Sequence, residues 1–224
     1  MPPDSGALAP RHARLMAAAS ELGVDVDDAA ADRLLAYLDL LQRWNATYNL
    51  TAVRDPDRML TQHLVDCLAV IGPLRRQLGS AASPRVLDVG SGGGLPGIVI
   101  ALLCPGVDVC CVDTVGKKAA FIQQVATSLK LPNLRTRHAR VEKLTDGAFD
   151  VVTSRAFASL ADFTALTRHH LGNHGVWLAM KGKDPADERA ALPADINVFH
   201  VEPLSVPGME AERCLVWMRP GPSL

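Results

Sequence analysis

The pattern of apolar and polar positions divides the chain into two parts, and the first part is helical. Apolar residues recur at helical spacing after Asp27, and again after Asp55-Pro56, where a capping side chain precedes a proline suited to the first helical position. The two apolar stripes are Leu34, Leu35, Leu38, Leu41 and Trp44, and Met59, Leu60, Leu64, Cys67, Leu68 and Ile71. We therefore expect a helical extension over residues 14–79, preceded by a Pro/Ala-rich, disordered tail over residues 1–13.

Strand and helix patterns alternate in the second part, which follows a Gly/Ser/Pro linker at 79–84. The predicted strands are 85–89, 108–113, 134–138, 149–154 and 175–180, with helical patterns at 96–104, 117–130 and 159–171. Such alternation predicts β-α-β units on a parallel sheet with right-handed crossovers. The rhythm ends at 196–202 and 213–218, two strand patterns without a helix between them, which predict a terminal antiparallel hairpin.

A glycine-rich segment joins the first predicted strand to the next helix and carries the clearest chemical signal. It begins at Asp88 as Asp-Val-Gly-Ser-Gly-Gly-Gly-Leu-Pro-Gly, and such a loop lets a ligand approach the backbone at a helix N-terminus. Gly92, Gly94 and Gly97 fit the G-x-G-x-x-G pattern of dinucleotide sites. Asp88 with glycines 90, 92 and 94 fits the D-x-G-x-G-x-G pattern of S-adenosylmethionine-binding loops. The loop alone leaves both cofactors open.

The terminal hairpin favours S-adenosylmethionine, because it distinguishes class I methyltransferases from dinucleotide-binding folds. The predicted fold is therefore α/β, a class I S-adenosylmethionine-dependent methyltransferase over residues 85–224 with a Rossmann-like, mostly parallel sheet and the N-terminal helical extension. A nicotinamide-dependent oxidoreductase is the competing class of enzyme.

Composition and charge limit the possible partners. Of 224 residues, 48% are hydrophobic and 21% charged, and no apolar run reaches the roughly 18 residues of a membrane span, so no membrane is expected. Residues Met1 to Pro10 have no positive region followed by an apolar core, so secretion is not expected either. The net charge of −1 permits an RNA substrate without indicating one. Five cysteines without a C-x-x-C pair or metal-ligand spacing indicate a reduced cytoplasmic protein and no metal site.

Residues just after the strands are the site candidates, since ligands of a parallel sheet bind at the carboxyl ends of its strands. Asp113 is placed to accept both ribose hydroxyl hydrogens, although it also suits a helix cap. Val141 and Glu142 follow the third strand, where their backbone is expected to meet the adenine. Arg155 follows the fourth strand and is expected to bind the cofactor or an RNA phosphate, and Lys181 follows the fifth and is expected to contact phosphate.

The segment after the fourth strand, Ser154-Arg155-Ala156-Phe157, excludes some chemistries. It is neither the (Asp/Asn)-Pro-Pro-aromatic motif of many amine methyltransferases nor the Pro-Cys nucleophile of cytosine-C5 enzymes. Phe157 suits either base stacking or the core. Two further pairs, His63 with Asp66 and His169 with His170, are interpreted as structural, because no third ligand lies near them in the sequence.

These segments together resemble the bacterial small-subunit ribosomal RNA guanine-N7 methyltransferases, also called the glucose-inhibited division B family, from about residue 20 to 219. The segments that carry the resemblance are Arg43-Trp44-Asn45, Asn49-Leu50-Thr51-Ala52, Arg54-Asp55-Pro56, Gln62-His63-Leu64-Val65-Asp66, Asp88 to Gly97, Ser154 to Leu160, and Lys181-Gly182. The resemblance implies contacts to the methyl donor at Gly90, Leu95, Val141, Glu142 and Arg155. We add Gly92 from the D-x-G-x-G-x-G pattern and Asp113 from its place at the end of the second predicted strand.

The resemblance also implies the reaction, in which S-adenosylmethionine donates a methyl group to N7 of one guanosine in the decoding-region loop of 16S rRNA. The partner is then 16S rRNA or the small ribosomal subunit, and the protein is expected to be a cytoplasmic monomer. N7 has an in-plane lone pair and no proton to lose, so we expect no catalytic acid or base, only positioning for in-line transfer. The competing hypotheses are the nicotinamide-dependent oxidoreductase and a non-catalytic RNA-binding factor on a methyltransferase scaffold.

Overall fold

A single sheet of seven strands organises the computed structural model, which describes residues 5–155, 157 and 159–221. The strand order is β3-β2-β1-β4-β5-β7-β6, and the first five of these strands run parallel. β7 pairs antiparallel with β5 and with β6, which confirms the predicted terminal hairpin. The predicted class I methyltransferase fold is thereby confirmed.

The strands are β1 (Arg85–Val89), β2 (Asp108–Asp113), β3 (Leu134–His138), β4 (Phe149–Ser154), β5 (Leu171–Lys181), β6 (Ile196–Leu204) and β7 (Arg213–Pro220). The α-helices are α1 (Ser5–Glu21), α2 (Asp28–Tyr48), α3 (Pro56–Met59), α4 (Asp66–Leu78), α5 (Gly97–Leu103), α6 (Gly116–Ser128), α7 (Leu160–Thr167) and α8 (Ala186–Ala190). A π-helical turn, η1 (Leu60–Val65), joins α3 to α4, and two 3-10 turns are η2 (Val141–Lys143) and η3 (Arg168–His170).

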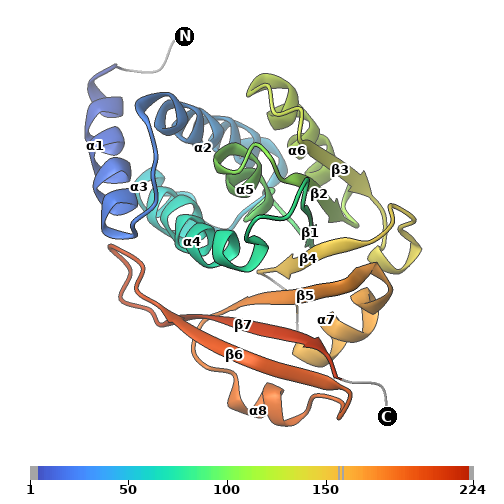
Figure 1. The fold of residues 1–224 in the computed structure, drawn as a ribbon. Helices are drawn as coiled ribbons and strands as arrows, with labels where there is room; N and C mark the ends of the chain where they lie inside the picture. Colours follow the sequence, from blue (N-terminus) through green and yellow to red (C-terminus); the bar gives the residue numbers. More distant parts are fainter. Residues whose placement is uncertain (1–4, 156, 158, 222–224) are drawn as a thin grey trace.

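The two faces of the sheet are covered unequally. α4, α5 and α6 lie on one face with α2 outside them, and α7 lies on the other face (Figure 1). Successive strand residues alternate between the two cores, so that Val86 and Cys111 belong to the first core and Leu87 and Cys110 to the second. The neighbouring Cys110 and Cys111 therefore point to opposite faces of the sheet, and all five cysteines are buried and free.

The N-terminal helices share their core with the sheet. Leu34, Leu38 and Leu41 of α2 belong to the same hydrophobic cluster as α5, α6 and one face of the strands. Both predicted helix starts are confirmed, because Asp27 and Asp55 each accept a backbone N–H of the first turn, at 2.7 and 2.8 Å. The division into an extension over 14–79 and a domain over 85–224 stays a prediction about folding units, since one core spans both.

Two expected boundaries differ from the structure. α1 begins at Ser5, so the expected disordered tail of 1–13 is helical from that residue, and Arg11 forms an ion pair with Asp39 of α2 at 3.0 Å. β5 begins at Leu171 rather than at 175, because Leu171 pairs with Phe149 of β4 although the residues after it are exposed or half-buried and carry no apolar signal. The helix expected over 159–171 correspondingly ends at Thr167 and continues as η3.

A buried carboxylate fixes the turn from β1 into α5. Asp88 is fully buried, and its Oδ2 atom accepts the Gly97 N–H at 2.9 Å. A Cβ atom on Gly97 would lie 2.4 Å from Cys111 Sγ and 2.9 Å from Asp88 Oδ2, so only glycine allows this approach of helix to strand. The other oxygen of Asp88, Oδ1, is buried without a hydrogen-bond partner. Burial raises the pKa of Asp88 to about 7.

No helix among the residues with described positions has the length and apolarity needed to cross a membrane.

Asp88 makes the stability of the fold depend on pH. Its pKa in the folded state lies above the ordinary 3.8. Between about pH 4 and 7 the folded protein therefore keeps a proton that the unfolded chain has already released. The free energy of unfolding of the wild type, relative to Asp88→Asn, should therefore fall by roughly 2–3 kcal/mol between pH 5 and 8. Urea unfolding of both proteins across this range measures the difference, from which the other titrating groups cancel. A difference that does not change with pH would contradict the assignment.

Candidate active site

The site lies where the parallel strands end. The carboxyl ends of β1, β2, β3, β4 and β5 bring together the glycine-rich loop, Asp113, the η2 turn, Arg155 and Lys181. Ser154 of β4 donates its hydroxyl hydrogen to the Val89 carbonyl at 2.9 Å, which ties the ends of the two central strands together. Three neighbouring cavities, which share lining residues, open along this edge.

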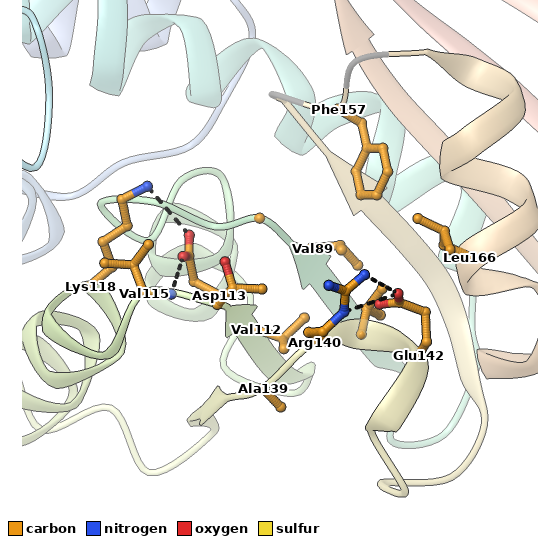
Figure 2. Close-up of a pocket in the computed structure, with 13 residues that line it drawn as sticks. Val89, Val112, Asp113, Val115, Lys118, Ala139, Arg140, Glu142, Phe157 and Leu166 are labelled. Atoms are coloured by element: carbon orange, nitrogen blue, oxygen red, sulfur yellow. Dashed lines mark hydrogen bonds and ion pairs between the residues drawn. The ribbon is translucent and has the colours of Figure 1, made fainter.

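The first cavity, here called the main cavity, has a volume of about 420 Å³ and contains four of the predicted site residues (Figure 2). Its walls include Gly90, Asp113, Lys118, Val141, Glu142 and Phe157. The ring centroids of Phe157 and of Phe163 in α7 are 5.3 Å apart, so Phe157 packs on the second core and also lines the cavity.

Asp113 is held in place by the backbone. Its Oδ1 atom accepts the Val115 N–H and its Oδ2 atom accepts the Gly92 N–H, both at 2.9 Å, while Lys118 Nζ lies 3.7 Å from Oδ2. Asp113 therefore fixes the turn before α6 and also lines the cavity, and its contact with ribose hydroxyls stays a prediction. Each carboxylate oxygen has a second lone pair with which to accept a further hydrogen.

The η2 turn forms the opposite wall. The Val141 carbonyl accepts the Leu144 N–H at 3.1 Å and lies 2.8 Å from Nε2 of His170, which is buried. The Glu142 carboxylate accepts two N–H groups of Arg140 at 2.9 and 3.3 Å (Figure 2), and hydrogen bonds from its own backbone N–H and from Arg140 lower its pKa. The turn therefore presents a fixed backbone to the cavity, and His170 helps to fix it.

The second cavity, here called the loop chamber, has a volume of about 200 Å³ and shares Gly90 and Lys118 with the main cavity. The glycine-rich loop contributes Gly92 and Leu95 to its wall. The opposite wall comes from α2 and the segments after it, with Leu41, Leu50, Thr51 and His63.

The third cavity, here called the basic chamber, has a volume of about 300 Å³ and shares Arg155 and His63 with the loop chamber. Its charged lining residues are Asp66, Arg155, Lys181 and Arg213. Asp66 is buried and accepts the Arg213 Nε–H at 2.9 Å, and its other oxygen lies 3.7 Å from Arg155 Nη1. Arg155 also donates to the Gln62 carbonyl at 3.1 Å.

One positive charge remains in the basic chamber. Lys181 is paired with Glu188 of α8 at 2.8 and 3.0 Å, and Asp66 offsets one of the two arginines. The three cations therefore face two carboxylates, which leaves a net charge suited to one phosphate group.

His63 and Asp66 do not pair with each other, contrary to the interpretation of their spacing. His63 lies on the π-helical turn η1, with Nε2 3.1 Å from Thr51 Oγ1 and Nδ1 buried without a partner, whereas Asp66 binds the two arginines. Burial, and then the nearby Arg155 guanidinium, lower the pKa of His63 to about 4, so the imidazole is neutral at physiological pH.

The sequence identified the strand-end residues but missed the other half of the site. The structure brings Gly90, Gly92, Leu95, Asp113, Val141, Glu142, Arg155 and Lys181 to the walls of the three cavities. Sequence reasoning missed Thr51, Lys118 and Arg213. Arg213 lies 147 residues from Asp66, so no local pattern indicates their contact. Within the described ranges, no cluster of three or more His, Cys, Asp or Glu side chains could hold a metal ion.

Comparisons with known proteins place the chain in a family. The GidB family, described as rRNA small subunit methyltransferase G, matches residues 30–216. A protein named ribosomal RNA small subunit methyltransferase G from an Acidovorax species is 64% identical over 209 residues, covering 90% of this chain and 92% of that protein. A protein of the same name from Leptothrix cholodnii is 65% identical over 206 residues, covering 92% of this chain and 94% of that protein.

A solved structure shows the same fold. The crystal structure of TrmN from Thermus thermophilus matches with a TM-score of 0.55 at 18% identity, over 72% of this chain and 53% of that chain. Fold, strand-end cavities and sequence relatives thus agree, and the chain belongs to the GidB family of rRNA small subunit methyltransferases.

Proposed function

We propose that the protein transfers a methyl group from S-adenosylmethionine to N7 of one guanosine in the decoding-region loop of 16S rRNA. Membership of the GidB family supports small-subunit rRNA as the substrate, and the class I fold supports the donor. The protein acts on this RNA in the cytoplasm, as a monomer.

The residues at the strand ends fit this donor. The main cavity lies within the range of about 300–1,000 Å³ that is typical of small-molecule sites. Gly90 has a φ of +67° and open space where a Cβ atom would be, so its backbone meets the cavity directly. When bound, the donor supplies an electrophilic methyl group on a sulfonium.

Each wall then has one task. Asp113 accepts the ribose hydroxyls, and the Val141–Glu142 backbone meets the adenine. Gly90, Gly92 and Leu95 surround the methionine end, at the loop chamber.

The basic chamber receives the target nucleotide. Arg155 lines both this chamber and the loop chamber, so one side chain contacts the donor side and the acceptor side. The residual positive charge of the chamber, to which Lys181 contributes, attracts the phosphate of the nucleotide. Guanine N7 faces the deep major groove of an RNA helix, so the target base enters unpaired or flipped.

We choose N7 as the acceptor atom because the described residues of the basic chamber include no suitable general base. Among the described residues that line it, His63 has a pKa of about 4, Asp66 is engaged by two arginines, and the other charged groups are cations. A general base works best with a pKa near the operating pH. An amine acceptor must lose a proton, whereas N7 attacks with its in-plane lone pair, so this chamber suits N7.

The modified atom tests the proposal. The purified protein is incubated with labelled S-adenosylmethionine and either naked 16S rRNA or 30S particles, and the methylated nucleotide is mapped by mass spectrometry and by cleavage chemistry specific for 7-methylguanosine. We expect a single guanosine methylated at N7 within the decoding region. Methylation at an exocyclic amine, at a ring carbon or at a ribose hydroxyl would contradict the proposal.

Lys181 should contribute to RNA affinity through its charge. Lys181→Met leaves Glu188 with the Leu160 N–H but without its cationic partner, and it removes the net positive charge of the basic chamber. We expect the KM for RNA to rise several-fold and the dependence of log affinity on log salt to weaken by about one unit, with the KM for the donor unchanged.

Lys183 provides the matched control. It lies two residues further on and is exposed, outside the lining of the basic chamber. Lys183→Met should leave the KM for RNA nearly unchanged. Equal effects of the two substitutions would show that Lys181 acts only as part of a general surface charge.

A further inference from the structure

Helix α2 of the N-terminal region touches the glycine-rich loop with a polar side chain. Tyr37 is fully buried, and its hydroxyl donates a hydrogen bond to the Gly93 carbonyl at 2.9 Å. Burial raises the pKa of the Tyr37 phenol well above its ordinary value, so the hydroxyl keeps its hydrogen and remains the donor.

The loop also packs closely on α2. A Cβ atom on Gly93 would lie 3.3 Å from Leu41 Cδ1 and 3.5 Å from the Tyr37 hydroxyl oxygen, so the loop meets the helix without a gap. The Tyr37 and Trp44 rings pack against Phe121 of α6, with ring centroids 6.2 and 5.5 Å away. α2 therefore holds a fixed position relative to the donor cavities.

Other groups hold the loop from the side of the sheet. The Val112 carbonyl accepts the N–H groups of Gly90 and Ser91 at 2.9 and 3.2 Å, and Asp113 accepts the Gly92 N–H. Tyr37 holds the next residue, Gly93, from the opposite side. The loop is thus restrained between β2 and α2, with its conformation fixed before a ligand arrives.

We propose that Tyr37 is a positioning residue of the methyl-donor site. Its hydroxyl donates to the Gly93 carbonyl, so that the glycine-rich loop keeps the conformation that binds the donor. Helix α2 thereby helps to form the cofactor site. The inference rests on the proposed function in one respect, that these cavities take S-adenosylmethionine. A loop that is ordered in advance binds more tightly, because the ligand does not have to order it.

Tyr37→Phe tests this role, with Tyr48→Phe as its matched control. The first change removes only the hydroxyl and keeps the ring, whereas Tyr48 lies exposed at the end of the same helix. Titration calorimetry with S-adenosylhomocysteine should show a Kd that is raised roughly two- to tenfold in Tyr37→Phe and unchanged in Tyr48→Phe.

Two further readouts separate positioning from a general loss of stability. Amide hydrogen exchange at residues 92–95 should be faster in Tyr37→Phe, at a temperature well below its Tm. The KM for S-adenosylmethionine should rise, while the KM for RNA and kcat at saturating donor stay at wild-type values. A lower Tm with an unchanged Kd for S-adenosylhomocysteine would show that Tyr37 only stabilises the fold, and would overturn the proposal.

Gly93→Ala is a second variant with the same expectation. The added methyl group would lie 3.3 Å from Leu41 Cδ1, tighter than an ordinary contact, and would strain the packing of the loop on α2, so the Kd for S-adenosylhomocysteine should rise here as well. If Tyr37→Phe fails to fold, an unchanged Kd in Gly93→Ala overturns the proposal.

The outcomes also separate this proposal from the proposed function. A methyl group mapped to an atom other than guanine N7, together with the expected rise in Kd, would refute the N7 assignment and leave the role of Tyr37 intact. A wild-type protein that does not bind S-adenosylhomocysteine would overturn both.

Discussion

The hydrogen bond from the Gly97 N–H to the buried Asp88 carboxylate determines how the rest of this structure is arranged. It joins the end of the central strand β1 to the first turn of α5, and the missing Cβ of Gly97 allows that close approach. The loop between these two residues is consequently short and fixed at the centre of the sheet edge, where the other strand ends converge on it. Burying an ionised carboxylate away from water costs free energy, and this cost raises the pKa of Asp88.

The chemistry of the site follows from positions rather than from a reactive side chain. Three neighbouring cavities lie along the strand ends, and Arg155 lines both the loop chamber and the basic chamber. Burial keeps His63 neutral, and Asp66 is engaged by arginines, so under the proposed function the described part of the basic chamber would bind and orient a nucleotide without removing a proton from it. Such a site is useful for a nucleophile that already has a free lone pair.

The sequence was sufficient for the sheet and for one half of the site. The ends of the parallel strands can be predicted from apolar runs and from the glycines that follow them. The residues after the strands line the cavities because parallel strands end at one edge of the sheet. The start of β5 was missed because Gly172, Asn173 and His174 are not buried and leave no apolar pattern.

The ion pairs of Asp66 with Arg213, and of Lys181 with Glu188, depend on how β7 and α8 fold back, which spacing along the chain does not reveal. The role of α2 was hidden in the same way, because Tyr37 occupies an ordinary core position of a helical stripe until the glycine-rich loop is placed beside it.

A comparison of the wild type with His63→Gln tests most directly the claim that positioning alone supports methyl transfer. Single-turnover rates with saturating donor and RNA would be measured for both proteins from about pH 6 to pH 9, with the Kd for S-adenosylhomocysteine and for RNA as controls for binding. We expect the two rates to agree within a few-fold at every pH, because His63 is neutral throughout this range and no described group of the basic chamber has to remove a proton from the acceptor. A His63→Gln rate that is lower by about a hundredfold or more, with both Kd values unchanged, would contradict this expectation and identify His63 as a general base.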